Sequence, residues 1–270
     1  MKILSIAFLA SLLLAIPVIA GEASDDAEAK LSVKLSGGIG SGAIWDGPRD
    51  VLYDNGPIVT STGTGVGGAD ESIIDATETT NGFGCQFAAD IRLSDDFTIP
   101  AGQTWSINSV TLFGYQTDSG TSSTIVGAYI EIFDNPPDYG TSVYGDLTTN
   151  VLTSTSWMNC YRVQSSASGT NDQRPIMANV CDYSTPITLT EGTYWICWQL
   201  DGTGASGPWY PPVTINGQLV TGNAVQYYNL GWGAVTDNGS GNAKGLPFIL
   251  SGTTSGALQN ETWATIKSVF

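Results

Sequence analysis

Residues 189–201, LTEGTYWICWQLD, decide the fold that the sequence predicts. Glu191 and Gly192 indicate a turn, and the seven residues 194–200 include two Trp, one Tyr, one Ile, one Leu and one Cys. Because side chains alternate between the two faces of a strand, this run is apolar on both faces. A strand of that kind belongs in the middle of a sheet, with the other strands arranged around it.

The rest of residues 51–252 consists of short β-prone runs separated by Gly, Asn, Asp and Pro. Most of these runs have one polar face, and residues 126–133 show the alternation clearly. This region has no sustained helical spacing and no internal repeat. The pattern predicts an all-β fold, a two-sheet antiparallel β-sandwich of jelly-roll type. Separate strands are expected, among others, at residues 96–99, 105–117, 176–181, 187–189 and 194–200.

The two ends of the chain differ from this β-sandwich domain. Residues 1–20 contain one Lys, an apolar run and small residues before a cleavage position after Ala20, which is typical of a signal peptide. We therefore expect a secreted, extracellular or cell-surface protein. The apolar run is shorter than the roughly 20 residues that a span needs, which favours a cleaved signal peptide over a membrane anchor, and no membrane span is expected in the mature chain. Residues 21–50 are interpreted as a flexible lead-in, and residues 253–270 as a linker and short amphipathic C-terminal tail.

The charge and the missing histidine exclude several classes of function. The formal net charge is −16, which excludes nucleic acid as a partner, since phosphate binding needs a basic surface. The chain has no His, so it can form neither a Ser-His-Asp nor a Cys-His catalytic set, nor a His-ligated zinc site. Catalysis by carboxylates remains open.

The four cysteines predict structural disulfides, because the chain is expected to be exported and none of them lies in a C-x-x-C spacing. The strands at 156–164 and 176–181 flank a polar loop, and a hairpin centred near residues 170–171 would place Cys160 opposite Cys181. This leaves Cys85 to pair with Cys197, which would tie an early strand to the central one.

Several segments resemble those of a family of exported bacterial β-sandwich proteins that is uncharacterised and often carries C-terminal surface-sorting or anchor tails. The similar segments are SDDFTIPAGQTW (94–105), SVTLFGYQT (109–117), GDLTTN (145–150), RPIMAN (174–179), GTYWICWQ (192–199), GPWYPPVTINGQLVTGNAVQ (207–226) and GLPFILSG (245–252). The resemblance implies no established activity and no catalytic residues. The chain departs from the family pattern in its four cysteines and in a tail without an apolar span, although TWATIKSVF is similar to short endings of other exported bacterial proteins.

The loop at residues 207–212, GPWYPP, is the strongest candidate for a ligand site. Its three prolines stiffen the loop, and the adjacent Trp209 and Tyr210 point in opposite directions if the backbone is extended. At least one ring is then expected at the surface, where it can stack on a sugar, together with Trp232 from the nearby GWG turn. The alternative is that both rings cover the open end of the sandwich as a plug.

Oxygen-rich and acidic residues offer two further kinds of site. The loops 134–138 (DNPPD) and 237–242 (DNGSGN) are candidates for calcium, with Asx-turns as the alternative. A glycoside hydrolase needs two carboxylates across a cleft. The available carboxylates are Glu131, Asp134, Asp138, Asp146, Glu191 and Asp201.

These observations favour a non-catalytic extracellular or cell-envelope β-sandwich module with a structural or adhesive role. The alternative is a carbohydrate-binding module that uses the aromatic loop, and the third reading is a carboxylate-dependent glycoside hydrolase. Glycans or other cell-surface proteins are the expected partners. A face with several exposed aromatic rings would favour binding, and a cleft with paired carboxylates would favour hydrolysis.

Overall fold

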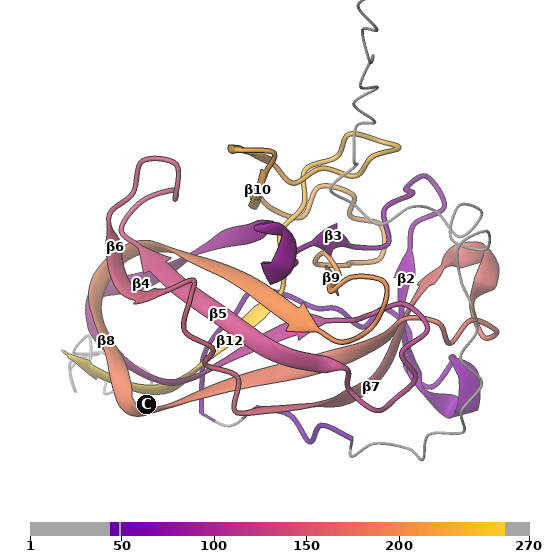
Figure 1. The fold of residues 1–270 in the computed structure, drawn as a ribbon, viewed down its shortest axis with the longest axis horizontal. Coiled ribbons are helices and arrows are strands. Elements are labelled where there is room, and N and C mark those ends of the chain that lie inside the picture. The colour runs from indigo at the N-terminus through magenta and orange to yellow at the C-terminus, as the bar shows by residue number, and fades with distance from the viewer. Residues whose placement is uncertain (1–43, 49, 257–270) are drawn as a thin grey trace, which may run out of the picture.

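The computed structural model describes residues 44–48 and 50–256, and this part of the chain is an all-β sandwich, as predicted (Figure 1). Its strands are β1 (Val51–Asp54), β2 (Asp70–Ile74), β3 (Phe83–Gly84), β4 (Arg92–Gly114), β5 (Ile125–Phe133), β6 (Ser142–Asp146), β7 (Ser154–Gln164), β8 (Pro175–Gly202), β9 (Trp209–Tyr210), β10 (Val225–Tyr228), β11 (Gly231–Ala234) and β12 (Phe248–Gly256). Short 3-10 turns occur at η1 (Val66–Gly68), η2 (Phe87–Ala89) and η3 (Ser165–Ala167). Within the described residues no helix is long and apolar enough to cross a membrane.

The two longest strands, β4 and β8, form one antiparallel ladder that bends in the middle and enters both layers of the sandwich. The first half of β4 pairs with the second half of β8, up to Ile99 opposite Gly192. The ladder resumes beyond the bend at Thr104 opposite Thr190. Figure 1 shows β8 curling round the end of the sandwich from one layer to the other. The segments expected as separate strands are therefore parts of two continuous, bent strands.

The other strands extend this bent ladder on both sides. One layer has the order β6, β5, second half of β8, first half of β4, β10, β11. The other layer has the order β2, β7, first half of β8, second half of β4, β12, β1. The pair β2–β7 is parallel, which departs from the predicted antiparallel pattern. The small β3–β9 sheet is joined to the large one by single bridges, such as Tyr115 with Trp209.

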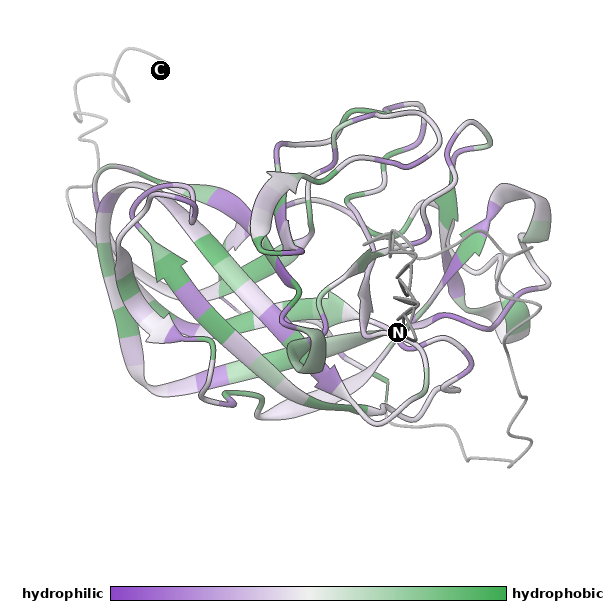
Figure 2. Cartoon of the chain, turned by 45° about the horizontal axis from the view of Figure 1, so that its top comes forward, coloured by the Kyte–Doolittle hydropathy of each residue, from purple (hydrophilic) through white to green (hydrophobic). Residues whose placement is uncertain are grey.

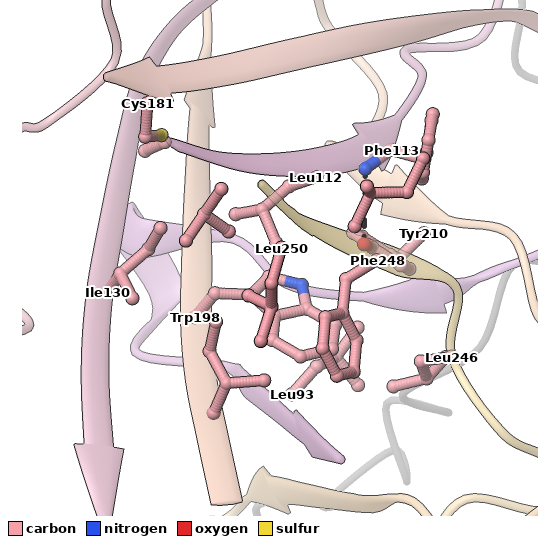
Figure 3. Packing of buried hydrophobic residues seen from close by; sticks show 14 of the residues in the cluster. Leu93, Leu112, Phe113, Ile130, Cys181, Trp198, Tyr210, Leu246, Phe248 and Leu250 are labelled. Carbon is pink, nitrogen blue, oxygen red and sulfur yellow. Dashed lines mark hydrogen bonds between the residues drawn. The ribbon is translucent and has the colours of Figure 1, made fainter. Parts of the chain in front are cut away.

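The core lies between the two layers and is rich in aromatic rings. Trp198 of β8 is fully buried and lies 4.9 Å from the ring of Tyr210 and 6.1 Å from that of Phe248, measured between centroids. Figure 3 shows these rings packed against aliphatic side chains of β4 and β12. Figure 2 shows hydrophobic and hydrophilic residues alternating along the strands, as a two-layer sheet structure requires. The prediction that residues 194–200 form a central strand is confirmed.

The predicted disulfides are wrong, because all four cysteines are free and buried. The β7–β8 ladder places Tyr161 opposite Pro175 and Ser154 opposite Val180, with an irregularity between Trp157 and Tyr161. Cys160 and Cys181 therefore lie about six residues apart along the ladder, roughly 20 Å at the rise of a strand. That separation is far beyond the reach of a disulfide.

The second predicted pair, Cys85 with Cys197, lies on opposite faces of the sheet. The backbone oxygen of Cys85 accepts a hydrogen bond from the N–H of Leu200 at 2.8 Å, and Cys85 belongs to the core. Cys197 lies between the core residues Ile196 and Trp198 in β8 and points away from that core. Burial raises the pKa of all four thiols, that of Cys181 to about 12.

Contacts with the sandwich begin before β1, and the last strand continues past residue 252, where the domain was expected to end. The N–H of Trp45 donates to the backbone oxygen of Trp157 at 2.7 Å, so the last part of the expected lead-in lies against β7. At the other end, β12 continues to Gly256, where it pairs with Gln103 of β4. The expected signal peptide at residues 1–20 and the amphipathic tail lie outside the described residues.

Candidate ligand-binding site

The structure places Tyr210 of the predicted aromatic loop in the core. The Tyr210 side chain is 0% exposed, and its hydroxyl accepts a hydrogen bond from the N–H of Phe113 at 3.1 Å (Figure 3). The same hydroxyl donates to the backbone oxygen of Pro247 at 2.5 Å. A ring held in this way cannot stack on a sugar at the surface, so the expectation for Tyr210 is corrected.

Trp209 is half-buried and also packs against the core. Its backbone exchanges two hydrogen bonds with Tyr115, of 2.8 and 2.9 Å, and its indole N–H donates to the hydroxyl of Ser206 at 3.0 Å. The loop therefore closes one end of the core, which agrees with the plug alternative.

Trp232, the third predicted ring, lies on the edge strand β11 and is half-exposed. Its ring is 5.5 Å from that of Tyr227 in β10, and the guanidinium of Arg92 lies 4.6 Å from the centre of the Tyr227 ring. Since Tyr210 is buried, the three predicted residues do not form one aromatic platform.

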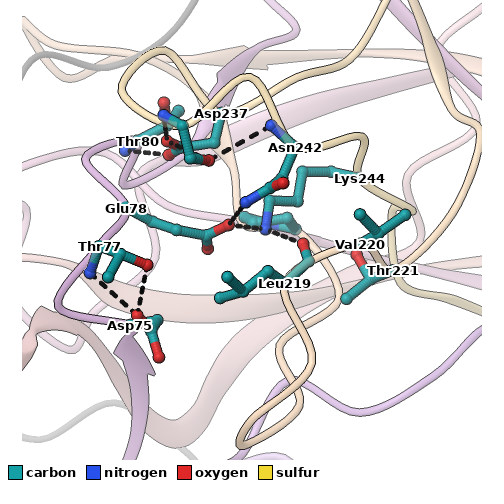
Figure 4. Close-up of polar contacts among 12 residues, drawn as sticks. Asp75, Thr77, Glu78, Thr80, Leu219, Val220, Thr221, Asp237, Asn242 and Lys244 are labelled. Carbon is teal, nitrogen blue, oxygen red and sulfur yellow. Dashed lines mark hydrogen bonds and ion pairs between the residues drawn. The ribbon is translucent and has the colours of Figure 1, made fainter.

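The loop at 237–242 is organised around the carboxylate of Asp237, and the Asx-turn alternative describes it well (Figure 4). One oxygen of Asp237 accepts the N–H groups of Thr79 and Thr80, and the other accepts those of Gly239 and Ser240. Burial raises the pKa of Asp237, but these hydrogen bonds outweigh burial and hold the pKa below its ordinary value. Both carboxylate oxygens are thus already used by the protein.

The loop at 134–138 has a similar arrangement. Asp134 accepts the N–H of Thr141 at 2.7 Å and the side-chain amide of Asn135 at 3.3 Å. In the part of the chain that the structure describes, no group of three or more acidic or Cys side chains is placed to hold a metal ion.

The six carboxylates considered for hydrolysis lie on several strands and loops. Glu131 lies in β5, Asp146 ends β6 and is held by the hydroxyls of Thr148 and Thr149, and Glu191 accepts the N–H of Gly102 at the bend of β4. None of the six lines either of the two cavities described below.

A groove of about 480 Å³ runs between the outer face of the second layer and the residues before β1. We call residues 44–48 and Asp50 the N-terminal arm. The arm is held over the sheet by the hydrogen bond from Trp45 to Trp157 and by a 2.9 Å bond from the N–H of Gly252 to the backbone oxygen of Asp50. The groove is lined by Ile44, Trp45, Asp46, Gly47, Pro48, Asp50, Asn108, Ser109, Thr111, Ser154, Ser156, Val180, Asp182, Ser251 and Gly252.

The floor of the groove follows from the alternation of residues in neighbouring strands. Asp182, Ser109 and Ser251 lie side by side across β8, β4 and β12. Their neighbours in the chain, such as Val110 and Cys181, point into the core. Because the outward residues are small and polar, the sheet face stays open instead of being covered by its own side chains.

Several hydroxyls of this floor form no hydrogen bond with another residue that the structure describes. Thr111 is 3% exposed and Ser251 is 8% exposed, and neither hydroxyl forms a hydrogen bond with another described residue. The same holds for the hydroxyls of Ser109, Ser154 and Ser156. These hydroxyls line the groove and are free to exchange hydrogen bonds with water or with a ligand.

Trp45 supplies an aromatic wall next to these hydroxyls. Its ring packs edge-on against Phe113, with centroids 5.8 Å apart, and the side chain is half-buried. The sequence interpretation missed this residue because residues 21–50 were expected to be flexible. The available signal was a lone Trp in the segment AIWDGP, directly before the first strand.

A second, smaller cavity of about 200 Å³ lies between β2 and the loop at 212–218. Lys244 contacts Glu78 and the backbone oxygen of Leu219 at its wall (Figure 4). Arg162, which also lines it, donates to backbone oxygens and to the hydroxyls of Ser72 and Thr214. Its charged groups are therefore engaged in holding the loops together, unlike the hydroxyls of the larger groove.

The described residues form a β-sandwich with an open polar groove on one outer face. Comparisons with protein-family models, with curated proteins and with solved structures found no match. The assignment of function therefore depends on the chemistry of the groove.

Proposed function

We propose that the protein is a non-catalytic β-sandwich module that acts outside the cell or in the cell envelope and adheres to glycans through the groove under the N-terminal arm. The observation that carries this proposal is the row of hydroxyls that form no hydrogen bond with another described residue, which lies beside the indole ring of Trp45. The expected export of the chain and its resemblance to exported β-sandwich proteins support the location.

Sugar recognition needs two kinds of contact, and the groove offers both. Hydroxyl and amide groups exchange hydrogen bonds with sugar hydroxyls, and here Ser109, Thr111 and Asn108 are available for this role. An aromatic ring provides a flat apolar surface for the C–H groups of a sugar face, and Trp45 is placed for it. The volume of about 480 Å³ falls in the range of small-molecule sites.

A second candidate function is protein adhesion through the hairpin of β10 and β11. Leu230 at its tip is 88% exposed and has a left-handed backbone with φ of 66°. A bulky residue in that conformation costs about 1 kcal/mol or more, and an exposed Leu gains no compensating burial. Such a tip favours contact with another protein, one of the expected partners.

The proposal is tested by calorimetric titration of the domain with soluble plant, bacterial and animal polysaccharides. Glycan binding with dissociation constants of roughly 10 μM to 1 mM is expected. Trp45→Ala should weaken it by about tenfold or more, a loss of about 1.4 kcal/mol. Trp232→Ala is the matched control, since that ring lies outside the groove.

Three outcomes would contradict the proposal. They are no binding at millimolar concentration, equal binding by wild type and Trp45→Ala, and loss of binding only in Trp232→Ala. A melting curve of each variant shows whether it keeps the fold. Release of new reducing ends from a bound polysaccharide would contradict the non-catalytic assignment and favour the hydrolase.

A further inference from the structure

We infer that the groove selects a positively charged glycan, a polymer of amino sugars with free amines, over neutral and acidic glycans. This inference rests on the proposed function and specifies its ligand. It comes from the charged residues that line the groove, which face it from two directions. Asp46 and Asp50 belong to the N-terminal arm, and Asp182 belongs to β8 in the sheet.

The carboxylates of the arm have few competing contacts. The side chains of Asp46 and Asp50 are exposed and form no hydrogen bond or ion pair with another described residue. Asp182 accepts one hydrogen bond, from the hydroxyl of Thr153 at 3.0 Å, and keeps further acceptor capacity. An ammonium group has three donors, and its hydrogen bonds to carboxylates are shorter and stronger than those between neutral groups.

The described part of the domain offers no cation to the groove. Its lysines and arginines are Arg92, Arg162, Arg174 and Lys244, and none of them lines the groove. Arg162, Arg174 and Lys244 are also almost fully buried. In the sequence, Arg49 is the one Lys or Arg in residues 44–50, and the three carboxylates that line the groove outnumber it.

The field of the whole chain acts in the same direction. With a net charge of −16, the protein repels acidic polysaccharides and attracts cationic ones before contact. In 0.1 M salt this attraction extends over a Debye length of about 10 Å, which exceeds the dimensions of a sugar ring. The preference should therefore weaken as salt is added.

The groove is suited to a sugar polymer rather than to a metal ion or to charge alone. Among the described residues, no group of acidic side chains is close enough together to hold a metal ion. The nearly buried side chains of Thr111 and Ser251 lie on the same floor, and their hydroxyls, which form no hydrogen bond with another described residue, can bond with the hydroxyl groups of a ligand. A chain of amino sugars offers separate ammonium groups to the carboxylates and hydroxyls to the floor.

The test compares four probes of equal length by calorimetry at pH 6 and low salt: glucosamine, N-acetylglucosamine and galacturonic acid oligomers, and oligolysine. The glucosamine oligomer should bind about tenfold more tightly than its acetylated form, and the galacturonic acid oligomer should not bind. Asp182→Asn should reduce the preference roughly threefold, as expected for one exposed charge contact. The control Asp201→Asn, which lies outside the groove, should leave it unchanged.

The failures of the inference and of the proposed function are distinguishable. Equal binding of the amine and acetylated oligomers, or tighter binding of galacturonate, overturns the charge preference but leaves glycan binding intact. Oligolysine that binds as tightly as glucosamine, or an equal effect of both Asp variants, shows that surface charge alone is responsible and also overturns it. If no oligomer binds, and the polysaccharide titration with Trp45→Ala is also negative, the proposed function fails.

Discussion

The indole ring of Trp105 stacks on the ring of Phe97, with centroids 6.3 Å apart and an interplanar angle of 9°. Both residues belong to β4 and lie on either side of its bend, so one strand packs against itself across the core. The partner strand β8 bends at the same level, near Gly192. The two layers of the sandwich are thus connected by continuous backbone at this end.

We expect the bend to depend on Gly102, which has φ of 76°, and Gly102→Ala tests this. No atom lies within 4 Å of the position that a Cβ would occupy, so the substitution costs only backbone strain. A loss of about 1–2 kcal/mol in the free energy of unfolding is expected, and Gly102→Asn should lose less because Asn tolerates the left-handed region. Denaturant unfolding measures both. Equal stability of Gly102→Ala and wild type would show that the bend does not require this conformation.

The sandwich could be predicted from the sequence, but the bent strands could not. The alternation in residues 126–133 and the doubly apolar run at 194–200 identified strands and their burial. The segments PAG at 100–102 and EG at 191–192 have turn composition, which predicts strand ends there. In the structure both segments lie within continuous strands, and the pairing resumes beyond the bend after a shift in register. Whether a strand continues through such a segment depends on pairing between residues distant in the sequence, which local composition does not indicate.

The hydroxyl of Tyr210 is expected to stabilise the fold and to have no role in binding. Tyr210→Phe removes the partner of the Phe113 N–H and of the Pro247 oxygen in a fully buried site. This should cost roughly 2–3 kcal/mol in the free energy of unfolding. Glycan affinity of the folded variant should be unchanged, in contrast to Trp45→Ala. A variant with wild-type stability and lost affinity would restore the aromatic loop as the ligand site.

The cysteines are expected to be unreactive in the native protein. All four thiols are buried and burial raises their pKa, so a thiol reagent at neutral pH should label none of them in native conditions and all four in denaturant. Mass spectrometry of the labelled protein counts the free thiols. A Cys160–Cys181 crosslink in non-reducing peptide maps would contradict the register of β7 and β8.

Asp95 should make the stability of the domain depend on pH. It is 2% exposed, and burial raises its pKa to about 7, although the N–H groups of Leu246 and Asp96 and the amide of Asn55 oppose the shift. Since this folded pKa lies above the ordinary value of about 3.9, the native state binds the proton more tightly than the unfolded state. The contribution of Asp95 is greatest below about pH 4, falls as the pH rises to about 7, and stays constant above that.

The expected size of this effect is at most about 4 kcal/mol between pH 4 and pH 7. Asp95→Asn, whose amide resembles the neutral acid, separates it from other titrating groups. The unfolding free energy of the wild type should fall relative to that of Asp95→Asn as the pH rises. A difference that is flat from pH 4 to pH 8 would show that Asp95 has an ordinary pKa.

The sequence could not identify the groove, although most of its elements are visible in it. The small polar residues of the floor come from four strands, and only the observed register places Asp182, Ser109 and Ser251 in one row. Trp45 lies in a segment of low β-propensity and is positioned by a backbone hydrogen bond to Trp157, which no local pattern indicates. The prolines around Trp209 predict a rigid loop, but they do not predict how exposed its ring is. The exposure of the Trp209 ring is set by its packing against residues distant in the sequence.

The most direct measurement of the central claim is an NMR titration of the isotope-labelled protein with the glycan that binds best in the calorimetric screen. We expect the largest shift changes at the indole N–H of Trp45 and at the backbone amides of Ser109, Thr111, Ser156 and Ser251, all of which line the groove. Changes centred instead on Trp232 and Tyr227 of the β10–β11 hairpin, with the groove signals unmoved, would contradict the account.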